Sequence, residues 1–280
     1  MELGAKLLQK YAAHFPLPDP TVVLAEHKTV SGVRIKTYTP VNATAEMPAV
    51  CYFHGGGFVV GEVDRDDPLV TRLAKDTGLV FASVEYRLAP KHVYPAGFND
   101  CTDAANWCID NAKFLGTNGS VLLMGGSAGA ALALGAALKL IEEGKAAMLQ
   151  GVVACQPMTL HPDAVPAEYQ DHYTSYDEHA THTLNSAQAM RAFFGESLSE
   201  SSGPNIDVDR WSTELHNAPK VDPYIQCLHH PRLKDLPAVY INACECDTLR
   251  DDARALKRTL DKLGYRTWSH APQDDPNANV

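Results

Sequence analysis

The sequence lacks several features that would place it in other classes of protein. It has no apolar run of roughly 18 residues, so no transmembrane helix is predicted, and its first residues lack the long apolar region of a signal peptide. Basic residues are outnumbered, because 24 Lys and Arg against 34 Asp and Glu give a net charge of −10. A nucleic-acid-binding protein would need the opposite balance. We therefore expect a cytosolic protein without a nucleic-acid partner.

Cysteine is present, but without the spacing of a disulfide framework or a metal site. The number is odd, and most of the residues lie inside apolar runs, where a thiol packs as a small hydrophobic group. Cys244 and Cys246 are too close together for the usual Cys-x-x-Cys pair, and both are interpreted as buried thiols. Reduced cysteines are thus expected at positions 51, 101, 108, 155, 227, 244 and 246.

The chain does contain enough apolar material for one large core, since 45% of its 280 residues are hydrophobic and 21% are charged. Short apolar runs alternate with stretches of helical spacing. The apolar runs cover residues 33–38, 49–53, 79–84, 121–124, 151–155 and 238–242. The helical stretches cover residues 68–77, 99–111, 128–143 and 251–263, with Gly144 and Gly264 placed as C-terminal stops. This alternation predicts an α/β fold with a mostly parallel central sheet and flanking helices.

One segment interrupts the alternation. Residues 158–219 are rich in His, Ser, Asp and Pro, and strand signals fade there. Because ligands bind at the carboxyl ends of the strands in open α/β sheets, we interpret this segment as an inserted helical lid over that edge. The predicted domains are a core of residues 21–157 and 220–280 and a lid region of residues 1–20 and 158–219.

The predicted lid contains aromatic residues and histidines. Phe193, Phe194 and Trp211 either line an acyl pocket or simply pack. A zinc site would need closely spaced ligand pairs with a carboxylate or thiolate partner, and only His179 and His182 are near each other. We therefore expect no metal and interpret the histidines as a solvated face of the lid. They are His161, His172, His179, His182 and His216.

The most informative motif is residues 125–129, Gly-Gly-Ser-Ala-Gly, which follows the apolar run 121–124 and opens an Ala-rich helix. This is Gly-x-Ser-x-Gly between a strand and a helix, where small neighbours allow a sharp, strained turn to expose the serine hydroxyl. The setting favours Ser127 as a nucleophile. A glycine-rich turn that binds phosphate is the alternative, although the chain has neither a Gly-x-Gly-x-x-Gly fingerprint nor a P-loop lysine.

A second motif directly follows the apolar run 49–53, because residues 54–58 read His-Gly-Gly-Gly-Phe. Three consecutive glycines leave their backbone N–H groups unobstructed. Such groups stabilise the negative oxygen of a tetrahedral intermediate by about 2.7 to 4 kcal/mol per donor. A flexible loop is the alternative interpretation, but the position ahead of the serine motif favours an oxyanion hole. His54 is interpreted as a structural anchor of the loop.

Taken in order, these motifs resemble a known family. Residues 54–58, residues 86–90 (Tyr-Arg-Leu-Ala-Pro), residues 94–98 (Tyr-Pro-Ala-Gly-Phe) and the serine motif resemble the hormone-sensitive-lipase branch of the α/β-hydrolases. The likeness runs over most of the chain, from about residue 33 to about residue 264. The resemblance implies the α/β-hydrolase fold with an inserted lid.

The resemblance also implies roles for individual residues. In that branch, a serine attacks an ester carbonyl, and two glycines of the triple-glycine loop hold the oxyanion together with the residue after the serine. These roles fall on Ser127, Gly56, Gly57 and Ala128, and the chemistry needs no cofactor. Gly126 stands where the branch often has aspartate.

The candidate acid lies in residues 245–251, Glu-Cys-Asp-Thr-Leu-Arg-Asp, which resemble the branch's Asp-Pro-Leu-Arg-Asp motif. Asp247 matches the catalytic acid, since a carboxylate beyond a strand's end can hold a histidine in one tautomer and stabilise its imidazolium. Thr248 stands where the motif has proline. Asp247 also suits a helix N-cap, which is compatible with catalysis. Asp251 is the second candidate for the acid.

No motif matches for the histidine. In the branch it lies about thirty residues past the acid, in a His-Gly-Phe-like motif before a final helix, which here falls near Asn277. Residues 269–280 are instead polar and rich in Pro and Asn, like a replaced or truncated tail. His270 is the only histidine after the acid, so the order serine, acid, histidine requires it as the base. Loss of the base is the alternative, and His229 and His230 are the other candidates.

We therefore expect a carboxylic-ester hydrolase, a serine esterase that acts on short or medium acyl esters through an acyl-enzyme intermediate. Its catalytic residues would be Ser127, Asp247 and His270, its partner a small-molecule ester, and its cofactor none. Two alternatives stay open. One is a catalytically impaired relative that binds small molecules, and the other is a lyase or transferase on the same fold. A homodimer is a further possible assembly.

Overall fold

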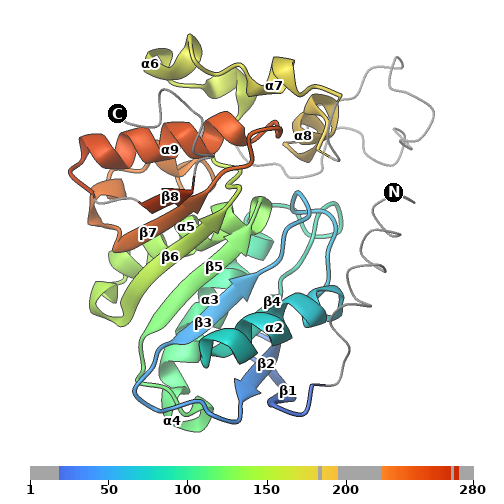
Figure 1. Cartoon of the computed structure of the whole chain (residues 1–280), viewed down its shortest axis with the longest axis vertical. Coiled ribbons are helices and arrows are strands. Elements are labelled where there is room, and N and C mark those ends of the chain that lie inside the picture. The colour runs from blue at the N-terminus through green and yellow to red at the C-terminus, as the bar shows by residue number, and fades with distance from the viewer. Residues whose placement is uncertain (1–18, 182–184, 195–221, 266–267, 271–280) are drawn as a thin grey trace.

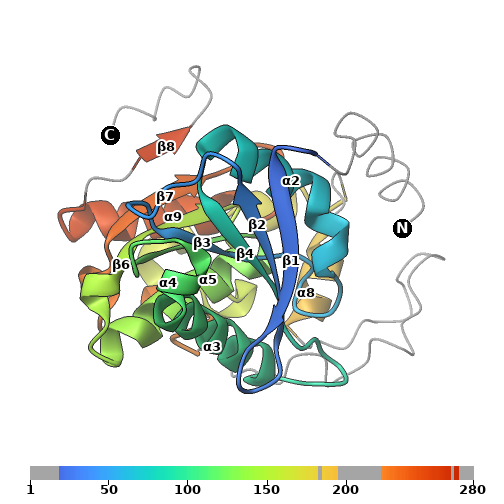
Figure 2. The same cartoon turned by 90° about the horizontal axis from the view of Figure 1, so that it is seen from below.

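The computed structural model describes residues 19–181, 185–194, 222–265 and 268–270. Within these residues, eight strands form one mostly parallel sheet with helices on its faces, so the predicted fold class is confirmed (Figures 1 and 2). In chain order the strands are β1 (Val22–Lys28), β2 (Arg34–Pro40), β3 (Ala49–Phe53), β4 (Val80–Glu85), β5 (Val121–Gly126), β6 (Leu149–Cys155), β7 (Ala238–Asn242) and β8 (Trp268–His270).

Across the sheet the strand order is β1-β2-β4-β3-β5-β6-β7-β8. The pairs β1–β2 and β2–β4 are antiparallel, and all pairs from β4 to β8 are parallel. The carboxyl ends of β3, β5, β6, β7 and β8 therefore meet at one edge of the sheet. In an α/β sheet this is the edge where ligands bind.

Helices cover both faces of the sheet, with α2 and α9 in front and α3 and α5 behind in Figure 1. The α-helices are α2 (Asp67–Thr77), α3 (Ala96–Asp110), α4 (Ala112–Leu115), α5 (Ala128–Glu142), α6 (Ala167–Gln170), α7 (Ser175–Glu178), α8 (Ala187–Phe193) and α9 (Arg250–Lys262). Short 3-10 helices are η1 (Val63–Asp66), η2 (Ala146–Met148), η3 (Pro162–Ala164), η5 (Cys227–His229) and η6 (Leu233–Asp235).

The core follows from the sequence pattern. Strand β3 lies between two parallel neighbours and is buried along its whole length, which explains its continuous apolar run. Helix α5 consists almost entirely of Ala, Gly and Leu and is buried nearly all round, as a helix without a polar face must be. Gly144 and Gly264 follow their helices at φ angles of 77° and 83°, so both predicted stops are confirmed.

Some elements differ from the sequence prediction. Strand β1 was not predicted, because most of its residues are exposed at the sheet edge and its apolar pattern is weak. Cys244 and Cys246 are exposed, so their interpretation as buried thiols is wrong. They lie in the turn after β7 rather than in the strand, and this part of the turn is at the surface.

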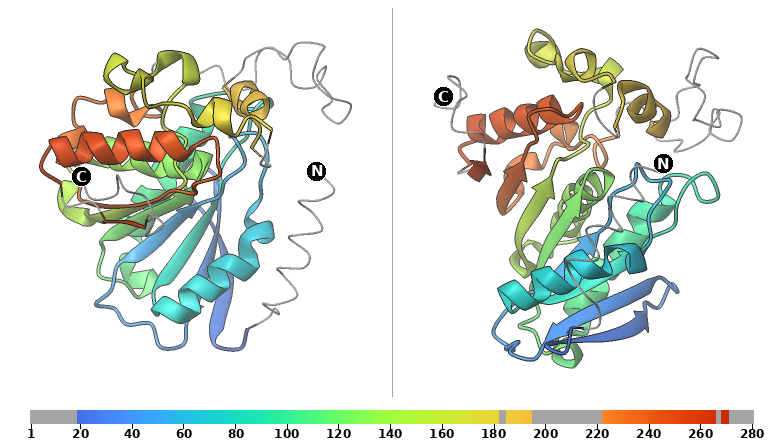
Figure 3. Two further views of the ribbon diagram at one scale, coloured as in Figure 1. Left: turned by 45° about the horizontal axis from the view of Figure 1, so that its top comes forward. Right: turned by 45° about the vertical axis from the view of Figure 1, so that its right-hand side comes forward.

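The described part of the segment between β6 and β7 contains α6, α7 and α8. Figures 1 and 3 show these helices beyond the carboxyl ends of the central strands, beside α9. We call residues 158–181 and 185–194 the insert. Trp211, His182, His216 and residues 1–18 of the predicted lid region lie outside the described residues, so the lid as a whole stays a prediction.

The insert is not simply a solvated face. His161 is 2% exposed, its Nδ1 accepts a hydrogen bond from the Asp163 N–H, and its ring packs against Phe194. The interpretation of this histidine as solvated is therefore wrong. His172 is exposed, as expected. In the described ranges, no group of three or more His, Cys, Asp or Glu residues could hold a metal ion, and no helix has the length and apolarity to cross a membrane.

Candidate active site

Ser127 lies on the turn between β5 and α5, at the carboxyl edge of the sheet. Its φ of 54° and ψ of −121° lie outside the regions that residues with side chains normally adopt. A Cβ atom on Gly125 would lie 2.3 Å from the Gly129 backbone, and one on Gly129 would lie 2.1 Å from the Phe53 carbonyl oxygen. Both outer positions of the motif therefore require glycine, as in a nucleophile elbow.

Backbone hydrogen bonds hold this turn in place. The Ser127 N–H donates to the carbonyl oxygen of Cys155 at 2.9 Å, and the Met158 N–H donates to the Ser127 carbonyl oxygen at 3.3 Å. The serine is partly exposed, and the next residue, Ala128, begins α5. The first N–H groups of a helix have no acceptor within the helix, so the Ala128 N–H is available to a ligand.

The triple-glycine loop lies directly beside the serine. A Cβ atom on Gly55 would lie 3.6 Å from Cβ of Ser127 and 3.0 Å from the carbonyl oxygen of Gly126. Gly56 and Gly57 have φ angles of 129° and 60°, which other residues rarely adopt. Within the part of the chain that the structure describes, the N–H groups of these two glycines donate to no acceptor.

His54 anchors the loop, as expected. Its ring stacks on Tyr86 with the centroids 4.2 Å apart, and the Tyr86 hydroxyl donates to the His54 carbonyl oxygen at 2.7 Å. Burial lowers the pKa of His54, which keeps the ring neutral at pH 7. The Ala89 N–H donates to the Phe58 carbonyl oxygen at 3.0 Å. The Tyr-Arg-Leu-Ala-Pro motif therefore braces the loop from outside.

Asp247 lies in the turn between β7 and α9, two strands from β5. Its Oδ1 accepts a hydrogen bond from the Leu249 N–H at 2.9 Å. Leu249 is itself the N-cap residue of α9, so the interpretation of Asp247 as the N-cap is wrong. Oδ2 of Asp247 has a longer contact, 3.4 Å, with Nδ2 of Asn185 from the insert. The carboxylate is thus oriented by one short bond on Oδ1, and Oδ2 keeps capacity for a second donor.

Asp251 is unsuited to the role of second candidate acid. It is 3% exposed and forms an ion pair with Arg250 at 3.0 Å. Its Oδ2 also accepts hydrogen bonds from the N–H groups of Thr174 and Ser175, both at 2.8 Å. These partners make Asp251 an anchor for the insert rather than a free carboxylate.

His270 is the last residue of β8, and its backbone pairs with Asn242. Asn242 pairs with Cys155, which pairs with Gly126, so His270 and the serine turn lie in one row across four strands. At a spacing of about 4.8 Å per strand, their backbones are about 14 Å apart. The base assignment of His270 stays a prediction.

His230 is unsuited to the role of base. Its Nε2 lies 3.3 Å from Oε1 of Glu142, the last residue of α5. Ser127 precedes the first residue of that helix, and 15 residues of helix span about 22 Å. His229 directly precedes His230, in the same 3-10 helix η5 and its cap. Neither histidine is therefore near the serine.

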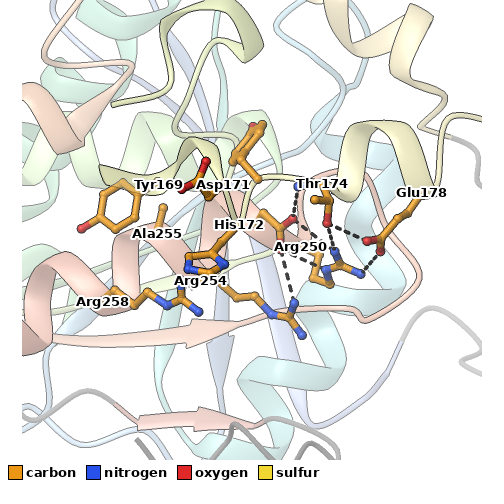
Figure 4. Close-up of a pocket in the computed structure, with 11 residues that line it drawn as sticks. Tyr169, Asp171, His172, Thr174, Glu178, Arg250, Arg254, Ala255 and Arg258 are labelled. Carbon is orange, nitrogen blue, oxygen red and sulfur yellow. Dashed lines mark hydrogen bonds and ion pairs between the residues drawn. The ribbon is translucent and has the colours of Figure 1, made fainter. Parts of the chain in front are cut away.

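A pocket of about 290 Å³ lies between the insert and α9 (Figure 4). Arg250, Arg254 and Arg258 line its wall on α9, and Thr174 and Glu178 lie opposite. Ser127 and Asp247 do not line it, whereas Asp251 does. Arg250 of α9 forms an ion pair with Glu178 of the insert at 2.7 Å. This contact beside the pocket joins the insert to the core.

Sequence reasoning missed two contacts that residues of the insert make at the site. The Phe193 ring lies on Gly57, because a Cβ atom on that glycine would be 2.3 Å from Cγ of the ring. Asn185 contacts the candidate acid, as described above. Phe193 was considered for an acyl pocket, but no motif marked either contact, since both depend on how the insert folds back over the strands.

A family model and several known proteins are similar in sequence to this chain. A family model described as the α/β-hydrolase fold matches residues 50–274. Versiconal hemiacetal acetate esterase of Aspergillus parasiticus is 41% identical over 260 residues, which cover 93% of this chain and 74% of that protein. A protein of Aspergillus terreus named FAD-linked oxidoreductase pytB is 38% identical over 257 residues, 91% of this chain. The match spans only 29% of that longer protein.

Solved structures of esterases are also similar to this chain. An esterase of Pyrobaculum calidifontis has a TM-score of 0.77 and 29% identity, and the match covers 96% of this chain and 80% of that one. The sheet, the serine turn after β5 and the glycine loop after β3 define an α/β-hydrolase. The chain belongs to this family, in its hormone-sensitive-lipase-like esterase branch. Its relatives support carboxylic-ester hydrolase activity, and the binding-protein and lyase alternatives are not favoured.

Proposed function

We propose that this hydrolase cleaves esters through an acyl-enzyme on Ser127. A histidine takes the hydroxyl proton as Oγ attacks the ester carbonyl, and the N–H groups of Gly56, Gly57 and Ala128 hold the resulting oxyanion. The carbonyl re-forms as the alcohol leaves with the proton from the histidine. Water then attacks the acyl-enzyme by the same steps and releases the acid.

The proximity of the two glycine motifs carries this proposal. A Cβ atom on Gly55 would lie in van der Waals range of Cβ of Ser127, and the two glycines that follow it have unused N–H groups within the described residues. A partly exposed hydroxyl beside preorganised donors is the arrangement that acyl transfer requires. A phosphate-binding turn would not need the strained backbone of Ser127.

Asp247 is the proposed acid and His270 the proposed base. Asp247 follows β7 with one carboxylate oxygen held by the Leu249 N–H. His270 satisfies the chain order of the family, and it ends the strand next to β7. To serve as the base, its imidazole must reach the hydroxyl of Ser127 and bond Asp247 with its other nitrogen.

We propose short or medium acyl esters as substrates. Phe193 covers Gly57 and limits the space over the oxyanion loop, which favours a small acyl group. The name of the Aspergillus parasiticus relative, which specifies an acetate ester, supports the same choice. A cytosolic location and a homodimer stay predictions, the second testable by light scattering after size-exclusion chromatography.

Hydrolysis of p-nitrophenyl acetate and labelling by a fluorophosphonate probe test the proposed function. The wild-type chain should turn over the ester and be labelled, and Ser127→Ala should lose both. A folded wild-type chain with neither turnover nor labelling would contradict the proposal. Turnover that persists in Ser127→Ala would show that another group carries the reaction.

A further inference from the structure

Helix α8 lies between two parts of the proposed catalytic site, the acid Asp247 and the oxyanion loop. Asn185 precedes it and contacts the acid, whereas Phe193 ends it and lies on Gly57 of the oxyanion loop. The seven residues of this helix span about 10 Å. We propose that α8 is a strut, with Asn185 and Phe193 as positioning residues that hold Asp247 and Gly57 relative to each other. This inference rests on the proposed esterase function.

The first contact of the strut uses a residue that departs from the family motif. Thr248 replaces the proline of Asp-Pro-Leu-Arg-Asp, and its side chain is fully buried. Its Oγ1 donates a hydrogen bond to the carbonyl oxygen of Asn185 at 2.9 Å. Proline has no hydroxyl, so the usual family residue could not make this bond.

The same asparagine reaches the acid with its side chain. Nδ2 of Asn185 lies 3.4 Å from Oδ2 of Asp247, while Oδ1 is held at 2.9 Å by the Leu249 N–H. Asn185 therefore faces the carboxylate oxygen that a catalytic histidine would use. Through Thr248 and Asp247, two consecutive residues of the acid turn are bound to one residue of the insert.

A side-chain hydrogen bond stabilises the beginning of α8. The Ser186 hydroxyl accepts a hydrogen bond from the Ala189 N–H at 3.2 Å, which caps the helix. The insert is also tied to the acid turn through Ser175, whose hydroxyl donates to the carbonyl oxygen of Thr248 at 2.6 Å. The start of the strut therefore moves with the acid turn.

The other end of α8 meets the oxyanion loop. Met190 and Ala192 of this helix are buried at 1% and 3% exposure, so the helix is packed rather than loosely attached. Gly57 leaves the space that the Phe193 ring occupies, since a side chain at position 57 would overlap it. Displacement of the insert would therefore disturb both the acid and the oxyanion donors.

Steady-state kinetics of ester hydrolysis by the full chain test the strut. In Thr248→Val and Asn185→Ala, kcat should fall about tenfold with KM changed less than about threefold, because small misplacements of catalytic groups act mainly on the reaction step. Thr248→Ser keeps the hydroxyl and should restore kcat. The matched control is Gln170→Ala, which removes a hydrogen bond elsewhere in the insert, to the Val165 carbonyl oxygen at 3.1 Å.

The pH profile separates positioning from a general loss of structure. A misoriented Asp247 stabilises the imidazolium less, so the histidine pKa falls and the acid limb of kcat/KM should move to lower pH in Asn185→Ala. Gln170→Ala should leave that limb in place. If the wild type turns over ester and the strut variants match Gln170→Ala in kcat and pH profile, the strut is overturned. Absence of wild-type turnover instead overturns the esterase function.

Discussion

At the scale of single residues, two adjacent glycines of the serine motif have different surroundings. A Cβ atom on Gly125 would overlap the Gly129 backbone at 2.3 Å, but one on Gly126 would meet only the Cys155 carbonyl oxygen at 3.9 Å. Gly125→Ala should therefore lower the free energy of unfolding by about 3 kcal/mol or more, and Gly126→Ala should change it by less than about 0.5 kcal/mol. Urea unfolding measures both values.

The pair is its own control, because the same methyl group is added at neighbouring positions. Gly126→Ala should also retain fluorophosphonate labelling of Ser127, since the alanine side chain contacts nothing closer than 3.9 Å. Equal destabilisation by the two substitutions would contradict the proposed steric origin of the motif.

The buried carboxyl group of Asp252 should make the stability of the folded chain depend on pH. It is fully buried on α9, where its Oδ1 accepts hydrogen bonds from the Thr159 and Leu160 N–H groups and its Oδ2 one from the Tyr173 hydroxyl. Burial raises its pKa from 3.8 to about 7. Between these values the folded chain keeps a proton that the unfolded chain releases, so the free energy of unfolding should fall as pH rises.

Asp252→Asn isolates this effect, because asparagine keeps an oxygen for the two N–H donors and cannot ionise. The difference in free energy of unfolding, wild type minus variant, should decrease between about pH 4 and pH 7, by up to about 1.4 kcal/mol per pH unit. Denaturant unfolding at several pH values measures it. Parallel pH profiles for the two proteins would show that Asp252 does not titrate in this range.

At the scale of elements, the oxyanion loop depends on a neighbouring loop for its shape. Tyr86 is 3% exposed, and its hydroxyl is the donor to the carbonyl oxygen of His54. Tyr86→Phe leaves that buried oxygen without its donor, which should cost about 1 to 3 kcal/mol of stability. Because the loop carries the proposed oxyanion donors, kcat for p-nitrophenyl acetate should fall several-fold as well.

Tyr169→Phe is the matched control for this loop. Tyr169 is also buried, and its hydroxyl bonds Oγ1 of Thr259 at 2.7 Å, between α6 and α9. Loss of this hydrogen bond in Tyr169→Phe should lower the free energy of unfolding but leave kcat unchanged. A similar fall of kcat in both variants would mean that stability, rather than the shape of the oxyanion loop, controls turnover.

The elements that sequence reasoning predicted well are those with a local cause. Apolar runs gave β3 and β7 with the bounds the structure has, although β3 is buried on both faces and β7 fully buries only alternate residues. The Ala-rich helix α5 and its glycine stop were predicted to within one residue. Strand β1 was not predicted, and the inserted lid was predicted as helical but without bounds for its helices, because these positions depend on pairing and packing with distant segments rather than on local periodicity.

At the scale of the whole molecule, the fold brings together motifs that are far apart in the sequence. The glycine loop after β3 and the serine turn after β5 could be predicted as neighbours, because both follow adjacent parallel strands. The contacts of Asn185 and Phe193 could not, since they depend on the path of the insert. The histidine was not predictable either, because its motif is absent and only chain order points to His270.

The row of paired residues across β5, β6, β7 and β8 bears on which histidine is the catalytic base. His270 lies at the end of that row, whereas His230 pairs with Glu142 at the far end of α5. If chain order assigns the base, His270→Ala should lower kcat/KM by roughly 10³-fold or more, with the fold retained. His230→Ala should leave kcat/KM unchanged and lower only stability, because it removes a buried contact away from the serine.

Steady-state kinetics and circular dichroism of the two variants decide between the assignments. Wild-type turnover in a folded His270→Ala would exclude His270 as the base. This test is informative because the strand register puts about 14 Å between the backbones of His270 and the serine turn. A loss specific to His270→Ala would show that the end of β8 comes closer to the serine turn than its strand register alone implies.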